Sequence, residues 1–107
     1  MKLNDVPFET IKNGTKTIEL RLYDEKRRKI KIGDTICFKG KASTIKAIVK
    51  ALHIFRNLDE LYAALPLDKC GYTADELATA SPEDMLEYYT KEQIEKYGVV
   101  GIEIEVI

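Results

Sequence analysis

The sequence has no tryptophan, only one histidine and only two cysteines among its 107 residues. A single histidine, His53, excludes a multi-histidine metal site, and we interpret it as a structural residue. Cys37 and Cys70 lie far apart and form no CxxC pair, so neither a zinc site nor a disulfide framework is expected. We therefore predict no metal and no cofactor, and we interpret both cysteines as buried, reduced thiols.

Long apolar runs are also missing from the chain. No segment approaches the ~20 apolar residues that a membrane-spanning helix requires. The residues after Lys2 are mixed, unlike the apolar block of a secretory signal. Internal repeats and Ser/Gly/Pro-rich linkers are absent as well. We therefore expect one cytoplasmic domain over residues 1–107 with no membrane partner, and the oligomeric state is left open.

The overall charge is balanced, but the two halves differ strongly. Residues 1–56 hold 14 lysines and arginines against 6 acidic residues, an excess of +8. Residues 57–107 hold 3 against 12, an excess of −9. A basic face indicates an anionic partner such as nucleic acid. The alternative is that the two halves attract each other after folding.

The first half reads as one helix followed by strands. The helix begins near Asp5 and closes at Gly14, a residue suited to the left-handed position after a helix. From 18 to 22, apolar and polar residues alternate as in a strand. We expect a charged turn or short helix over 24–31, a turn at 33–34 and a strand over 35–38. Residues 44–55 fit either a strand or a helix, and their β-branched residues favour the strand.

The second half contains repeated helix-start signals. Capping spacing occurs at Asn57, Thr73 and Thr90, each followed three residues later by Glu or Gln, and Ser81 precedes a proline. Four short helices are expected, the last ending at Gly98, before an alternating strand that closes the chain. Strands that surround a helical insertion predict an α+β fold with a small, partly closed β-barrel.

The pattern G-x-K-x-x-E-x-R over residues 14–21 is the most unusual local feature. Glu19 and Arg21 point to the same side of the expected strand, because strand side chains repeat every two residues. An arginine held by a carboxylate keeps donors free for a phosphate or a base edge. Lys16 stands at the entry of the strand. The alternative is an exposed ion pair on a solvated sheet face, which contributes little.

Tyrosines near the carboxyl end form a second feature. Tyrosines beside a basic groove can stack on unpaired bases, whereas tyrosines at helical spacing usually pack into a core. For Tyr88 we favour the core. For Tyr89 and Tyr97 both interpretations stay open, and we keep them as candidate ligand contacts.

These features together resemble the ASCH domain family. The resemblance rests on residues 14–21, on the lysine-rich connector to Ile32-Gly33-Asp34, and on the ending Lys96-Tyr97-Gly98-Val99-Val100-Gly101-Ile102-Glu103-Ile104. It covers nearly the whole chain and is similar to the small stand-alone bacterial ASCH proteins. It implies a PUA-like α+β fold, a small mixed β-barrel flanked by short helices with a cleft beside it. It also implies RNA-related activity, with Lys16, Glu19 and Arg21 at the positions of the family's polar cleft motif.

Some relatives are implied to be enzymes, including an amidohydrolase that removes the acetyl group from N4-acetylcytidine. That branch has a lysine and, three residues later, a threonine nucleophile. Lys16 matches the lysine, but Glu19 occupies the threonine position, and a carboxylate does not replace an activated hydroxyl. Other relatives are credited with ribonuclease activity, which a lysine and a carboxylate can support by acid/base catalysis.

Our leading hypothesis is a module that binds RNA, a nucleotide or a nucleoside. Lys16 and Arg21 would contact phosphate or a base edge, and Glu19 would orient Arg21 or accept from a base amine. The basic connector 26–31 would add non-specific attraction. The first alternative is a hydrolase for a modified nucleoside, or a ribonuclease, with Lys16 and Glu19 as catalytic residues. A further alternative is a regulatory module whose acidic helices bind another protein.

Overall fold

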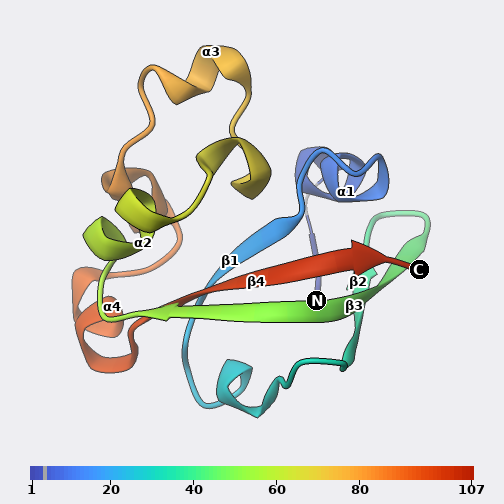
Figure 1. Cartoon of the computed structure of the whole chain (residues 1–107), viewed down its shortest axis with the longest axis horizontal. Coiled ribbons are helices and arrows are strands. Elements are labelled where there is room, and N and C mark those ends of the chain that lie inside the picture. Colours follow the sequence, from blue (N-terminus) through green and yellow to red (C-terminus); the bar gives the residue numbers. More distant parts are fainter. Residues whose placement is uncertain (4) are drawn as a thin grey trace.

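The computed structural model describes residues 1–3 and 5–107. In chain order the elements are α1 (Asp5–Lys12), β1 (Ile18–Leu22), η1 (Arg27–Lys29), β2 (Thr35–Lys39), β3 (Thr44–Phe55), α2 (Leu58–Ala64), η2 (Leu67–Cys70), α3 (Ala74–Leu77), η3 (Pro82–Glu87), α4 (Lys91–Tyr97) and β4 (Val99–Val106). Figure 1 shows the strands with α1 at one end and α2, α3 and α4 grouped at the other.

The strands form one curled sheet rather than a closed barrel. Its order is β1-β4-β3-β2, and every neighbouring pair of named strands is antiparallel. A register shift between Val49 and Ala51 bends β3 within its pairing to β4. Lys2 belongs to no named strand, but it forms an isolated parallel bridge with Lys39 at the end of β2. The result is a half-barrel, open between β1 and the amino-terminal residues, which confirms the predicted partly closed α+β fold.

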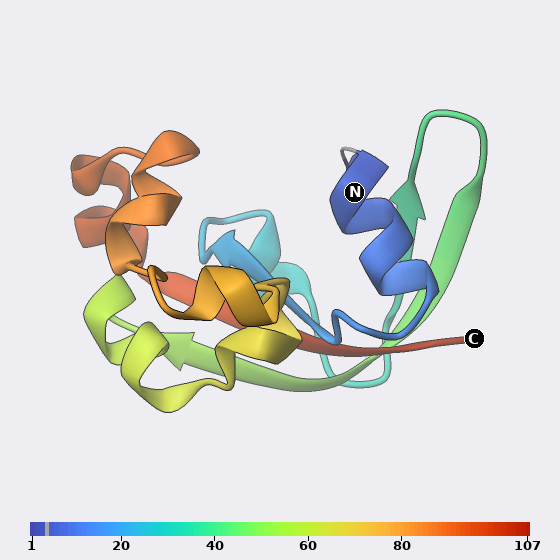
Figure 2. The same cartoon turned by 90° about the horizontal axis from the view of Figure 1, so that it is seen from above.

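Two clusters of buried apolar residues lie at different parts of this sheet. The first packs α1 against the strands, and its members are Phe8, Ile11, Ile36, Phe38, Ile45, Ala47, Val49, Val100, Ile102 and Ile104. The second packs β1 and the start of β4 against the helices between β3 and β4, and its members are Ile18, Leu20, Leu22, Leu58, Leu61, Cys70, Ile94 and Val99. Seen from above, α1 and these helices stand on opposite sides of β1 (Figure 2).

The segment from 44 to 55 is a strand, as its β-branched residues predict. Its first seven residues alternate between exposed and buried, which is the period of a strand with one covered face. The predicted capping residues are confirmed. Asn57 accepts from the Glu60 amide, and Thr73 and Thr90 each form a complete capping box. Ser81 likewise caps η3, with Pro82 at its first position.

The short helix η2 was not predicted from the sequence. Pro66 stands at its amino-terminal cap position, where no side-chain hydrogen bond is made, so no capping signal marks its start. It ends at Gly71, whose φ of 109° lies in the left-handed region.

The prediction that both cysteines are buried needs correction, because Cys70 is buried but Cys37 is only half-buried. Both are free thiols, as expected.

Candidate functional site

A cleft of about 590 Å³ lies over β1, between α1 and the helical segment that joins β3 to β4. Figure 2 shows β1 running between these two groups of helices. Pro7 and Thr10 of α1 contribute to one side, together with Lys2 and Leu3. The opposite side is lined by Tyr62, Cys70, Gly71, Tyr72, Glu76, Thr79, Asp84, Met85, Glu87, Tyr88 and Tyr89. Its volume is in the range of small-molecule sites.

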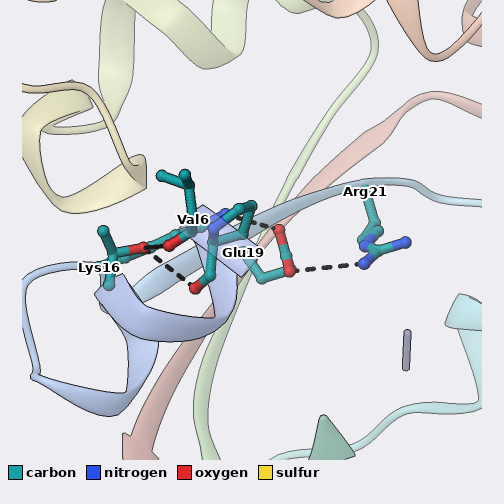
Figure 3. A network of polar contacts seen from close by, with 6 residues as sticks. Val6, Lys16, Glu19 and Arg21 are labelled. Carbon is teal, nitrogen blue, oxygen red and sulfur yellow. Dashed lines mark hydrogen bonds and ion pairs between the residues drawn. The ribbon is translucent and has the colours of Figure 1, made fainter. Parts of the chain in front are cut away.

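Three charged side chains from the motif meet on the α1 side of the cleft. Lys16 Nζ donates to Glu19 Oε1 at 3.0 Å. Arg21 Nη2 lies 3.5 Å from Glu19 Oε2. Figure 3 shows the Glu19 carboxylate between the two cations. The structure thus brings Lys16, Glu19 and Arg21 together in the cleft.

Local backbone geometry places Lys16 at this position. After α1, Gly14 adopts a φ of 83°, which a glycine tolerates without strain, and the Lys16 amide then donates to the Thr10 carbonyl at 2.9 Å. Across the cleft, the Lys16 side chain passes close to Gly71, where an added Cβ would lie 3.3 Å from Lys16 Cδ. The predicted end of the helix at Gly14 is confirmed, and this turn places Lys16 just before the start of β1.

Glu19 is deeply buried, so the alternative of an exposed ion pair on a solvated face is wrong. Its residue exposure is 4 %, and no other charged or polar residue of the described ranges is as fully buried. The side chains of Lys16 and Arg21 are 10 % and 18 % exposed. A buried carboxylate is tolerated only with partners, and removing one member of such a network typically costs about 3–5 kcal/mol. The network is therefore an internal feature of the cleft.

A chain of hydroxyl groups lies on the other wall. Tyr72 Oη donates to Asp84 Oδ2 at 2.8 Å, and Tyr62 Oη lies 2.6 Å from Tyr72 Oη. Because the Tyr72 proton is used toward Asp84, Tyr62 is the donor between the two phenols. Burial raises the pKa of both tyrosines above the usual phenol value, and the Asp84 hydrogen bond raises the pKa of Tyr72 further. Both hydroxyls are thus neutral at physiological pH.

The structure separates the two candidate tyrosines, Tyr89 and Tyr97, and corrects the prediction for Tyr88. Tyr89 lines the cleft and packs against the second apolar cluster. Tyr97 packs against the same cluster but lies outside the cleft lining, and its carbonyl accepts from Arg28. Tyr88 is 66 % exposed and lines the cleft, so its predicted core position is wrong. It lies just after η3, a short 3-10 helix whose residues are half-buried or exposed, which is why helical spacing misled the prediction.

Sequence reasoning missed Tyr62, Tyr72 and Asp84. Tyr62 and Tyr72 are ten residues apart, and they meet because the chain turns at η2 and Gly71 between them. The available signal was only the Ser81 cap, since Asp84 accepts from the Ser81 amide as well as from Tyr72.

Charge is unevenly distributed around the cleft. Lys2 and Arg21 are on the α1 side, and Glu76, Asp84 and Glu87 are on the opposite wall. The basic connector does not line the cleft. Within the connector, Arg27 is paired to Asp24 at 2.8 Å, and Arg28 lies over the Tyr23 ring. Both arginines thus have intramolecular contacts, and the attraction of the connector for an anion stays a prediction.

Neither a metal centre nor a transmembrane helix is seen in residues 1–3 and 5–107. Those residues contain no cluster of three or more His, Cys, Asp or Glu side chains arranged to hold an ion. None of their helices combines the length and the apolar character needed to cross a membrane.

The fold is an α+β half-barrel with short flanking helices and a polar cleft, and comparisons with known proteins specify the family. The model of the ASCH domain matches residues 1–107, so the chain belongs to the ASCH domain family. This chain is similar to the one in a crystal structure of hypothetical protein PH0355. The two sequences are 34 % identical over 100 % of both chains, and the TM-score is 0.78. A solution structure of protein PF0455 from Pyrococcus furiosus is 36 % identical over 100 % of this chain and 98 % of that one, with a TM-score of 0.71. No match was found among curated proteins.

Proposed function

We propose that the cleft binds a nucleotide, free or at the end of an RNA chain, with residues 1–107 acting as one domain. The observation that supports this most is the buried network on β1, in which Glu19 holds two cations inside a cleft. Arg21 contacts Glu19 through Nη2, and its guanidinium makes no other hydrogen bond or ion pair to a described residue, so its remaining donors are available for a phosphate. Lys16 holds the carboxylate from the other side and adds positive charge.

A small ligand fits the charges better than a long polyanion. The cations of the cleft are on the α1 side, so a phosphate is favoured there. Glu76, Asp84 and Glu87 on the opposite wall would repel a continuous phosphate backbone. A nucleotide avoids this by directing its phosphate to Arg21 and its neutral base to the tyrosine side, where Tyr89 and Tyr62 line the cleft and would contact the base.

The geometry supports binding better than hydrolysis. A hydrolase would need Lys16 or Glu19 free to exchange a proton with its substrate. Lys16 Nζ is instead bonded to Glu19 Oε1 at 3.0 Å, and in this ion-paired carboxylate–ammonium contact only Glu19 Oε2 lacks a hydrogen-bond partner among the described residues. The Thr10 hydroxyl, which also belongs to the cleft, donates to the carbonyls of Val6 and Pro7 and is not activated by a base.

Removal of Arg21 tests the proposal. Affinities for AMP, CMP, GMP, UMP and a short single-stranded RNA are measured by calorimetry at low salt. We expect Arg21→Ala to weaken binding by about 10- to 100-fold, because hydrogen bonds to charged groups contribute about 1.5–3 kcal/mol. Added salt should weaken the wild-type complex.

Arg56→Ala is the matched control. The Arg56 side chain is 89 % exposed, pairs with Glu60 and lies outside the cleft, so its loss should leave the affinity unchanged. Circular dichroism of both variants verifies that they are folded. Absence of any affinity at low salt, or equal affinity of the Arg21→Ala protein, would overturn the proposal.

A further inference from the structure

The floor of the cleft includes the free edge of the sheet. β1 is the terminal strand in the order β1-β4-β3-β2, so only its β4 side is paired with a strand. Leu20, at the centre of β1, belongs to the cleft lining. Glu19 and Arg21 flank Leu20 in β1 and also line the cleft, and the lining tyrosines come from the helical segment between β3 and β4.

The main chain of Leu20 points away from β4. At the two ends of the β1–β4 pairing, Ile104 N–H donates to the Thr17 carbonyl at 2.8 Å and Tyr23 N–H donates to the Gly98 carbonyl at 2.9 Å. Antiparallel strands alternate between residues that bond to the partner and residues that face outward. Odd-numbered residues of β1 therefore bond to β4, and Leu20 presents both its N–H and its C=O to the open edge.

No described residue forms a hydrogen bond to these two groups of Leu20. The residue is nevertheless only 8 % exposed. Main-chain polar groups of buried residues are almost always paired, so the unpaired N–H and C=O of this cleft residue are suited to receive bonds from a molecule in the cleft.

The neighbouring carboxylate supplies an independent observation. Glu19 Oε2 has no hydrogen-bond partner among the described residues, although its side chain is only 6 % exposed. Arg21 Nη2, at 3.5 Å, is in ion-pair range but beyond a well-formed hydrogen bond. Unmet hydrogen-bonding capacity thus occurs at two consecutive residues, Glu19 and Leu20, and both line the cleft.

We propose that the Leu20 N–H and C=O bind the hydrogen-bonding edge of a nucleobase. This proposal rests on the nucleotide binding proposed above. Each standard base presents a donor beside an acceptor in one plane, which one residue's C=O and N–H can match. An added peptide strand would need a row of such residues. Of the outward-facing residues of β1, however, only Leu20 lines the cleft, whereas Ile18 and Leu22 do not.

Nuclear magnetic resonance of the ¹⁵N-labelled protein tests this assignment directly. AMP, CMP, GMP and UMP are titrated in turn, and amide shifts and hydrogen-exchange rates are followed. With each nucleotide that binds, the Leu20 amide should shift downfield and exchange at least about 10-fold more slowly, because it gains an acceptor. The Ile18 amide, on the same edge but outside the cleft, is the internal control and should change little.

Nucleotides without the amino group provide the second measurement. Purine riboside 5′-monophosphate replaces AMP, and pyrimidin-2-one riboside 5′-monophosphate replaces CMP. Each should bind about 10-fold more weakly than its parent, because the buried Leu20 carbonyl is left without a donor.

The outcomes separate this inference from the proposed function. Arg21-dependent binding with an unchanged Leu20 amide and no preference for the amino nucleotides would overturn the edge contact alone. Failure of all four nucleotides to bind would overturn both proposals. Leu20 shifts that persist in Arg21→Ala at undiminished affinity would support the edge contact and refute the phosphate role of Arg21.

Discussion

Glu19 and Glu105 lie on adjacent antiparallel strands, and each has a cation 3.5 Å away. Arg21 is the partner of Glu19 at that distance, and Lys50 is the partner of Glu105. Their side chains are 6 % and 70 % exposed. These two pairs are nearly the same in residue type and spacing, whereas Glu19 is covered by the fold and has Lys16 as a second partner at 3.0 Å. The comparison teaches that packing around β1, rather than the charges themselves, makes the motif a candidate site.

The covering of β1 comes from two separate segments. On one side is α1, and on the other are η2 and the residues that follow it. The Thr17 amide, just before β1, donates a hydrogen bond to the Lys69 carbonyl of η2 at 2.9 Å. Glu105 lies near the end of β4, opposite Ile48, where the neighbouring side chains are exposed. A surface pair of that kind usually contributes less than about 1 kcal/mol.

Truncation of the two glutamates gives the largest expected difference. Glu19→Ala should lower the free energy of unfolding by about 3 kcal/mol, because it leaves Lys16 and Arg21 without their buried partner. Glu105→Ala should lower it by less than about 1 kcal/mol. Urea unfolding of both variants measures the difference. Equal losses would show that burial does not distinguish the two networks.

The two cysteines allow a smaller but sharper comparison. Burial raises the pKa of Cys70 from 9.0 to about 11, although the nearby Lys16 lowers it in part. At pH 8 the thiolate fraction is then roughly 100-fold below that of an unperturbed thiol, so alkylation of native Cys70 should be slower by about that factor. Mass spectrometry after iodoacetamide treatment, with Cys37→Ser to isolate the site, measures the rate.

The same shift predicts a direction for stability. A thiol whose folded pKa is raised contributes stability that is fully present below pH 9, and that contribution is lost as the pH rises toward 11. Cys70→Ser should therefore show a shallower decline of stability over this alkaline range. Rapid alkylation of native Cys70 at pH 8 would contradict its burial beneath the cleft.

Local signals in the sequence were enough to predict most of the elements. Capping residues such as Thr73 and Thr90 act within one helical turn, so they are readable without the tertiary structure. Alternation along β1 likewise separates Glu19 and Arg21 from the apolar residues of the strand. These patterns also selected three residues that do share a cleft, Lys16, Glu19 and Arg21.

Long-range packing explains what the sequence could not show. Alternation assigns Glu19 to a face of the strand, but only the docking of α1 determines that this face is covered. Tyr72 reaches Tyr62 through η2, whose start carries no capping signal. Tyr88 and Tyr89 are consecutive, yet one is mainly exposed and the other packs against a core cluster. Such differences depend on segments that are distant in sequence.

A structure of the protein with a bound 5′-mononucleotide, AMP first, tests the central claim most directly. The account predicts the phosphate within hydrogen-bond distance of Arg21, with Lys16 and Glu19 still paired and the base between the β1 edge and the tyrosine wall. A nucleotide bound in the groove beside Arg56 and Lys91, with the β1 cleft left unchanged, would contradict it.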